Sequence, residues 1–357
     1  MNHTKTKKNN KVIIVADLHF GENNNSERTG DNLLAVLDRI DFVRKEEGID
    51  RLVIAGDYFH HRDKIDVRTL ETGVLGARKL VNFRGLVGDQ PDLIVGNHDL
   101  YYRHSRDCTS ASVLDQYLTV HDQGPRIEGD LMLVPWVTGS EEWDQVVELF
   151  NRKKPRFVFG HFEFNKFRMN DHYVMEHGRS HRVFKSAEHV LTGHYHMRQQ
   201  KDNVTYVGSP IPFNFNDAND DQRGFAILDL DTGELEFRDL HIATVRSIGH
   251  EEFLKGDSLK GDPENTSVRV NIDEDIDDET MDKIKEKLEN DGFRTTKINY
   301  TPSRYKELVE SVNSEEIESV ENIDEAVVKY LQASDEIEGI DRDLLIDLYR
   351  EVAEEQS

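Results

Sequence analysis

Five short stretches of the sequence end in residues that can bind a metal ion or move a proton. They are Asp17 and His19 in DLH, Asp57 in GD, Asn97, His98 and Asp99 in GNHD, His161 in GH, and His194 and His196 in GHYH. Carboxylate, amide and imidazole groups without a thiolate suit Mn²⁺, Fe²⁺ or Zn²⁺ better than a soft metal. These residues therefore predict a site for a divalent metal.

The number of these side chains favours two ions over one. Two carboxylates, one amide and four imidazoles, with His98 left out, exceed what a single catalytic ion with an open position needs. The count fits two ions about 3.5–4 Å apart that share a carboxylate. A lone DLH or GH is more often an ordinary strand-to-loop turn. All five together are hard to explain as structure alone, because burying so many ionisable groups without a cation is costly.

Each motif follows a short apolar run, and four of the five runs reach the polar residue through a glycine. The runs are KVIIVAD (11–17), RLVIAGD (51–57), DLIVGNHD (92–99), RFVFGH (156–161) and EHVLTGH (188–194). Continuous apolar runs are typical of strands buried on both faces of a sheet. The carboxyl ends of such strands face one crevice, so we expect the motifs to converge there.

Helical patterns alternate with these strands. Residues 31–48 carry apolar side chains at helical spacing, with Gly48 in the position of a C-cap. Residues 68–83 predict a second crossover helix, and LMLVPW (131–136) predicts a strand without ligand-type residues. The alternation indicates an α/β fold.

The sequence changes character after about residue 240. Residues 267–272, 277–292 and 293–300 predict a small strand–helix–strand unit, and the acidic stretch 307–322 reads as a linker. GIDRDLLIDLYREVAEE (339–355) has an apolar stripe at helical spacing. That stripe fits packing within its own domain about as well as docking to a partner.

The net charge of −25 over 357 residues argues at first against a nucleic-acid partner. However, residues 251–357 alone hold 13 Lys+Arg against 32 Asp+Glu, whereas residues 152–201 hold 11 basic and 4 acidic residues. A local basic segment can bind a polyanion within an acidic molecule, although a solvated face explains the same composition equally well. The acidity also fits a salt-rich habitat.

The number of cysteines and the length of the apolar runs indicate the cellular compartment in which the protein is expected. The single cysteine, Cys108, excludes an intramolecular disulfide and favours a reducing compartment. The polar start MNHTKTKKNN is no secretory signal, and no apolar run approaches the ~20 residues that span a bilayer. We expect a soluble cytoplasmic protein, in the host cytoplasm if its source is viral.

The order D-x-H, G-D, G-N-H-D, G-H, G-H-x-H resembles that of the calcineurin-like metallophosphoesterases. GDYFHHRD, with His60 three residues after Asp57, and YVGSPIPFNFNDANDDQRGFAILDLD (206–231) look like the SbcD-type nucleases, the family of the meiotic recombination nuclease. In overall plan, and in VGNHDLYY, the chain is similar to the recombination nuclease subunits of T-even-like phages. The resemblance covers nearly the whole chain and is strongest over 11–231.

The resemblance implies a two-sheet sandwich flanked by helices, a small α+β capping domain and C-terminal helices. The implied domains are a nuclease domain at 1–240, a DNA-contacting cap at 241–303, an acidic linker at 304–322 and a partner-binding helical region at 323–357.

By the same resemblance, Asp17, His19, Asp57 and His196 would bind the first ion, and Asp57, Asn97, His161 and His194 the second, with Asp57 bridging. His98 would act on the scissile phosphate, and Asp99 would hold its tautomer. His60, with His61 beside it, would help to place the substrate, although both also fit exposed loop histidines.

The implied activity is two-metal hydrolysis of DNA phosphodiester bonds, as a 3′-to-5′ exonuclease on duplex ends and a single-strand endonuclease. By the resemblance, Mn²⁺ is the preferred metal for both ions, with Mg²⁺, Fe²⁺ and Zn²⁺ as alternatives. The implied complex is a homodimer within a heterotetramer with an SbcC-type coiled-coil ATPase, which would serve DNA end processing, recombination, repair and replication. DNA would be held through its backbone without sequence preference.

Three alternatives remain at this point. The same ligands serve protein phosphatases and small-molecule phosphodiesterases. Some relatives of this fold have lost catalysis and act as scaffold subunits, which would show as missing ligands. A pure DNA-binding module would not need two ions.

Overall fold

The computed structural model describes residues 10–169, 173–256, 259 and 262–300. The chain divides into two compact units, one of residues 1–270 and 282–297 and one of residues 271–281 and 298–357. The predicted linker 304–322, the region 323–357 and the helix at 339–355 lie outside the described residues. In the part of the chain that is described, no helix has the length and apolar character to cross a membrane.

Six strands form the first sheet in the order β12-β11-β1-β2-β3-β4. They are β1 (Lys11–Val15), β2 (Arg51–Ala55), β3 (Asp92–Ile94), β4 (Thr119–His121), β11 (Gly224–Asp229) and β12 (Leu235–Asp239). Strands β1 to β4 run parallel, whereas β11 pairs antiparallel with β1, and β12 with β11. The carboxyl ends of β1, β2 and β3 therefore meet at one edge of the sheet.

A second sheet of six strands has the order β5-β6-β7-β8-β10-β9. They are β5 (Arg126–Glu128), β6 (Leu131–Val134), β7 (Phe157–His161), β8 (His189–Gly193), β9 (Gln199–Lys201) and β10 (Val204–Tyr206). Strands β6, β7, β8 and β10 are parallel, and the edge strands β5 and β9 are antiparallel to their neighbours. Strand β7 ends in the GH motif at His161, and the GHYH motif begins at the last residue of β8, Gly193.

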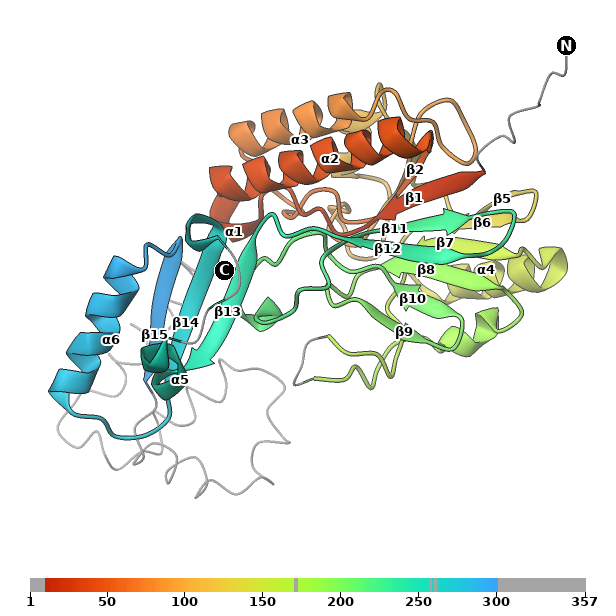
Figure 1. Ribbon diagram of the computed structural model, residues 1–357. Coiled ribbons are helices and arrows are strands. Elements are labelled where there is room, and N and C mark those ends of the chain that lie inside the picture. The colour runs from red at the N-terminus through yellow and green to blue at the C-terminus, as the bar shows by residue number, and fades with distance from the viewer. Residues whose placement is uncertain (1–9, 170–172, 257–258, 260–261, 301–357) are drawn as a thin grey trace, which may run out of the picture. The chain divides into compact units, whose positions relative to one another are not determined.

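The two sheets pack face to face, and helices cover their outer faces (Figure 1). One apolar cluster joins the sheets through side chains such as Val12, Val53 and Leu191, all fully buried. On the outer face of the first sheet, Ile13 and its neighbours pack against α2 (Glu27–Glu47) and α3 (Val67–Lys79). Helix α4 (Ser140–Lys153) covers the second sheet with residues such as Phe150. Burial on both faces explains the continuous apolar runs and confirms the predicted two-sheet sandwich flanked by helices.

The helix boundaries agree in part with the sequence patterns. Gly48 adopts φ 67 as the C-cap of α2, as predicted. The helix starts earlier than residue 31, because the side chain of Ser26 accepts a hydrogen bond from Thr29 N and caps it there. Helix α3 ends at Lys79, before the predicted residue 83.

A separate three-stranded sheet has the order β13-β14-β15. Its elements are β13 (Thr244–Gly249), α5 (His250–Lys255), β14 (Thr266–Ile272), α6 (Asp278–Asn290) and β15 (Thr295–Tyr300). Side chains along β14 alternate between buried and half-buried, and Asp277 accepts a hydrogen bond from Thr280 N at the start of α6. The predicted strand–helix–strand pattern over 267–300 is thus present, while the domain boundaries stay predictions.

Candidate metal centre and active site

Four of the predicted ligands sit in left-handed backbone conformations at the ends of their strands. The φ angles are 54 at Asp17, 48 at His19, 52 at Asp57 and 102 at His194. Non-glycine residues in this region cost about 1–3 kcal/mol each and persist only where the surrounding structure fixes them. The turns therefore hold these side chains in directions that ordinary strand-to-loop connections would not give.

Two glycines let the strand ends approach one another closely. A Cβ on Gly56 would lie 2.0 Å from His161 Nδ1, and one on Gly96 would lie 2.2 Å from Asp57 Oδ1. No side chain fits at such separations. Gly56 and Gly96 are thus each required by contact with a ligand from another strand, whereas Gly160 avoids the Phe162 ring and Gly193 the Ala55 backbone oxygen.

Seven predicted ligands converge at the carboxyl ends of the strands, and we call them the strand-end cluster. They are Asp17, His19, Asp57, Asn97, His161, His194 and His196. One subset joins Asp17, His19 and His196, whose ligand atoms lie within 4.8 Å of one another. His19 Nε2 and His196 Nε2 are 3.0 Å apart. These are three of the four residues predicted for the first ion, and their binding of an ion stays a prediction.

The second subset joins Asp57, His161 and His194, again within 4.8 Å. The Oδ1 of Asn97 lies 3.1 Å from His161 Nε2 and 2.9 Å from His194 Nδ1, so the amide belongs with this subset. His161 Nδ1 is 2.8 Å from the carbonyl of Ala55, to which it donates a hydrogen bond. That bond leaves Nε2 directed at the centre of the group.

Asp57 lies between the two subsets. Its Oδ2 is 3.6 Å from His19 Nε2 and 3.2 Å from His161 Nε2. Its other oxygen, Oδ1, accepts a hydrogen bond of 2.7 Å from His98 N. This position is the one that a carboxylate shared by two ions must occupy.

The charge balance of the cluster suits a cation. Burial raises the pKa of Asp17 to about 7, against the attraction of His161 and with repulsion from Asp57 adding to the rise. Burial lowers the pKa of His196 to about 4 and that of His19 well below its usual value. Among the described residues, the buried Oδ2 of Asp17 has no hydrogen-bond partner. A fully buried carboxylate oxygen without a partner, facing neutral imidazoles, fits a divalent metal.

The Asp57 carboxylate stays charged. Burial alone would raise its pKa, but attraction to His161 and a hydrogen bond with it, together with His19, hold the pKa well below the usual range. Burial would likewise lower the pKa of His161, but Asp57 outweighs it and raises the value to about 9. The residues present thus fit two divalent ions with Asp57 as their common ligand.

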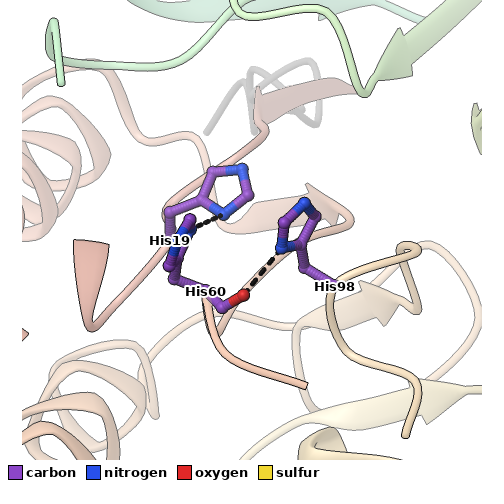
Figure 2. A group of neighbouring side chains, drawn as sticks. All are labelled: His19, His60 and His98. Carbon is purple, nitrogen blue, oxygen red and sulfur yellow. Dashed lines mark hydrogen bonds between the residues drawn. The ribbon is translucent and has the colours of Figure 1, made fainter. Parts of the chain in front are cut away.

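His98 stands beside the strand-end cluster and is half-buried. Its Nδ1 is 2.6 Å from the backbone oxygen of His60, to which it donates a hydrogen bond, as Figure 2 shows. The rings of His60 and His98 stack with centroids 5.2 Å apart, and His19 meets both edge-on. The hydrogen bond at Nδ1 leaves Nε2 of His98 free to exchange a proton with a substrate.

The predicted role of Asp99 is wrong. Its Oδ1 accepts hydrogen bonds from Tyr58 N and Phe59 N, and its Oδ2 accepts one from Gly96 N. Both oxygens are occupied by backbone groups, so the His60 carbonyl, not Asp99, fixes the tautomer of His98. Asp99 is fully buried and ties the loop after β2 to the turn after β3.

His60 is part of the site, with a partner that the sequence did not reveal. Its Nδ1 contacts Glu22 Oε2 and lies 3.3 Å from His19 Nδ1. Glu22 begins the turn α1 (Glu22–Asn25), in which Asn23, Asn24 and Asn25 have left-handed φ. His61 is half-buried beside the His60 ring, at a centroid distance of 4.8 Å.

Two aromatic residues that were not predicted from the sequence also lie against the strand-end cluster. Phe213 meets His19 and His196 edge-on, with centroids 5.6 and 5.5 Å away. Trp136 lies 5.1 Å from the His194 ring and 5.9 Å from that of His161. Phe213 falls in the stretch 206–231 and Trp136 ends the predicted strand 131–136, but neither pattern indicated contact with the ligands.

Several cationic side chains of the basic segment 152–201 already contact other groups of the protein. Arg156 pairs with Glu188, and Arg152 Nη1 is 3.7 Å from Glu148. Arg179 lies over the Trp143 ring. Contact of this segment with DNA remains a prediction.

Comparison with known proteins indicates the family to which the chain is similar. Residues 10–207 match the sequence pattern of the calcineurin-like phosphoesterases. A protein named exonuclease subunit 1 of Enterobacteria phage T4 is 29% identical over 343 residues, which is 94% of this chain and 96% of that protein.

Solved structures give weaker likenesses. A dimetal phosphatase from Danio rerio is 13% identical with a TM-score of 0.40, covering 66% of this chain and 98% of its own. The Pseudomonas putida nuclease MPE is 21% identical with a TM-score of 0.28, covering 54% of this chain and 66% of its own.

Proposed function

This chain belongs to the calcineurin-like phosphoesterase family, and we propose that it is a DNA nuclease subunit that hydrolyses phosphodiester bonds with two divalent ions. The observation that carries the proposal is the position of Asp57 between two ligand subsets, with His98 beside them. The relative from phage T4 is named an exonuclease subunit, which supports DNA as the substrate.

The family uses divalent metals, and we assign two ions to the strand-end cluster. The first would be held by Asp17, His19, Asp57 and His196, and the second by Asp57, Asn97, His161 and His194. When bound, such ions lower the pKa of water and neutralise negative charge on phosphoryl oxygens. The all-N,O ligand set favours Mn²⁺, with Mg²⁺, Fe²⁺ and Zn²⁺ as the other candidates.

The protein's own contribution to bond cleavage comes from His98. Its Nδ1 proton is committed to the His60 carbonyl, so the imidazolium presents only Nε2–H to the substrate. We assign Nε2–H as the donor to the departing sugar oxygen, a role typically worth ~10²–10⁴ in rate. His60, held against Glu22 and stacked on His98, would help to position the phosphate.

The wider assembly follows from the resemblance rather than from the described residues. We propose an SbcC-type ATPase partner that binds the C-terminal region, and a homodimer within that complex, acting in DNA end processing, recombination and repair. Deleting residues 339–357 should weaken binding of the partner and spare hydrolysis by the isolated subunit.

A phosphatase of the same family is the second candidate, because the ligand set alone does not select diesters. The test follows 3′-labelled linear duplex DNA with Mn²⁺, for the wild type and for His98→Leu. We expect metal-dependent loss of the label that falls about 10²–10⁴-fold in the variant, with two ions still bound per chain by elemental analysis.

The matched control is His241→Leu, an exposed histidine outside the site, which should cleave DNA like the wild type. Hydrolysis of p-nitrophenyl phosphate without any cleavage of DNA would identify a phosphatase instead. Loss of an ion in His98→Leu would show that His98 is a metal ligand rather than a proton donor.

A further inference from the structure

Two loops meet beside His98 and are tied together at their bases. The loop after β2 contains His60 and Arg62, and the loop after β3 runs from Asn97 to Thr109. The His98–His60 hydrogen bond and the contacts of Asp99 with Tyr58 N and Phe59 N join them. Leu100 and Thr109 form an antiparallel bridge, and Tyr101 N donates to the Cys108 carbonyl, so residues 101–108 form a closed tip.

The tip presents two tyrosines to solvent. Tyr101 is 48% exposed and Tyr102 is 52% exposed, and their rings meet edge-on with centroids 4.8 Å apart. Within the described part of the chain, neither hydroxyl has a hydrogen-bond partner. Exposed aromatic faces beside a phosphate-cleaving site are the kind of surface on which nucleobases stack.

Two arginines on these joined loops have no carboxylate partner among the described residues. Arg62 is half-buried and Arg103 is exposed, and neither makes a hydrogen bond or ion pair among the described residues. Burial lowers the pKa of Arg62, which the attraction of Asp57 opposes and repulsion from Arg103 reinforces. Arg62 and Arg103 lie on the two loops that the contacts of Asp99 with Tyr58 N and Phe59 N join.

Several other buried or partly buried arginines have a carboxylate partner, although some of their nitrogens stay without one. Arg198 Nη1 is 2.6 Å from Asp239, and Arg223 Nη2 is 3.0 Å from Asp217, while Arg106 contacts Glu142. Arg62 and Arg103 have no such partner among the described residues, so an anion from outside could pair with both. A phosphate is the anion that a guanidinium pair binds best, because each fork can hold two of its oxygens.

We infer that Arg62, Arg103, Tyr101 and Tyr102 form a strand platform for the DNA segment on the leaving-group side of the scissile bond. The inference rests on the proposed nuclease function. In an in-line displacement the leaving oxygen faces away from the attacking water, and His98 is the group assigned to it. The strand attached to that oxygen therefore continues past His98 onto the loop that carries the platform.

The platform has a consequence for substrate form. The two arginines take the backbone phosphate next to the scissile one, and the tyrosines stack on bases that have lost their pairing partners. Cleavage should then favour single-stranded ends over intact duplex. An abasic residue at the stacked position should weaken binding as much as removing the tyrosines does.

The experiment compares four variants of the full chain: Tyr101→Ala/Tyr102→Ala, Tyr101→Phe/Tyr102→Phe, Arg62→Ala/Arg103→Ala, and a control, Arg39→Ala/Phe42→Ala. The control removes an exposed arginine–aromatic pair on α2, in which Arg39 Cζ lies 4.6 Å from the Phe42 centroid. Each variant is measured for anisotropy of labelled single-stranded DNA in EDTA, for DNA cleavage in Mn²⁺, and for hydrolysis of bis-p-nitrophenyl phosphate.

We expect the double-alanine tyrosine variant and the arginine variant to bind single-stranded DNA roughly tenfold or more weakly. The phenylalanine variant and the control should bind like the wild type, and all four should hydrolyse the small diester normally. Binding by the tyrosine and arginine variants that equals the control would overturn the platform. So would an equal loss on the small diester, because the residues would then act on the metal centre.

Failure of the nuclease proposal gives a different result. A wild type that hydrolyses the small diester but cleaves no DNA contradicts the proposed function. The platform is still judged in that case by binding of single-stranded DNA, which does not depend on cleavage. No binding by the wild type would overturn the platform as well.

Discussion

The strand-end cluster and the strand platform lie next to each other and are built in opposite ways. Asp17, Asp57 and His161 are at most 1% exposed, whereas Tyr101 and Tyr102 are about half exposed. The cluster depends on strained turns and on glycines that permit close approach, and the platform depends on a loop tip with unpaired side chains. Groups that carry out the reaction need a fixed geometry, while groups that receive a long substrate need access.

The contrast also separates two kinds of energetic cost. In the cluster, buried carboxylates and imidazoles are costly until a cation satisfies them, so metal binding should stabilise the fold. In the platform, exposed rings and solvated guanidinium groups cost little in the free protein. Substitutions in the strand-end cluster should therefore lower metal content and the hydrolysis of every substrate. Substitutions in the strand platform should lower only the binding and cleavage of DNA.

The largest effect is expected from Asp57→Asn. The amide keeps the shape of the side chain but removes the one charge that lies between both ligand subsets. We expect metal content to fall and hydrolysis of both DNA and the small diester to drop by about 10³-fold or more, because a neutral amide is a poor shared ligand for two ions. Elemental analysis and steady-state kinetics measure the two effects.

Asp63→Asn, on the exposed part of the same loop, is the control for loss of one carboxylate and should behave like the wild type. Retention of two tightly bound ions in Asp57→Asn would show that Asp57 is not the shared ligand. Loss on DNA alone would contradict the separation between cluster and platform.

Sequence reasoning identified the cluster because its signal is local and repeated. An apolar run followed by a polar residue marks each strand end, and parallel strands bring such ends together. The glycines at positions 56 and 96 belong to the same signal. The subsets followed from the resemblance, and the positions of Asp17, His19 and His196 agree with it.

Contacts that depend on the path of loops were not predictable. Glu22 contacts His60 from another loop, and Phe213 reaches His19 across nearly two hundred residues of chain. The role of Asp99 was misassigned because neighbours in sequence need not be neighbours in space. Its side chain points away from His98 into backbone N–H groups at the base of both loops.

The corrected role of Asp99 gives the second prediction. In Asp99→Asn the amide oxygen can still accept from Tyr58 N and Phe59 N, but the amide NH₂ then faces Gly96 N–H. A buried donor left facing another donor costs about 1–3 kcal/mol, so the variant should unfold at lower denaturant concentration. Activity of the folded variant should stay within about tenfold of the wild type, because the His60 carbonyl still fixes His98.

A tautomer role for Asp99 predicts a different outcome for the same variant. Loss of the residue that orients a catalytic histidine costs about 10⁴-fold in turnover in serine proteases. A loss of that size in Asp99→Asn, with unfolding unchanged, would restore the original assignment. Ser110→Ala, whose hydroxyl lies 3.3 Å from the Asp99 backbone oxygen, is a mild control for the same loop.

The third prediction concerns Glu22, which contacts His60 beside the strand-end cluster. The carboxylate is 16% exposed and orients an imidazole that stacks on His98. We expect Glu22→Ala to lower kcat/KM on DNA about tenfold, in the range of groups that orient functional residues, without loss of metal. Glu22→Gln should recover most of the activity, because its amide oxygen still accepts from His60 Nδ1. Glu27→Ala, exposed at the start of α2, serves as the control. If Gln is as impaired as Ala, the carboxylate acts on the strand-end cluster through its charge rather than by positioning His60.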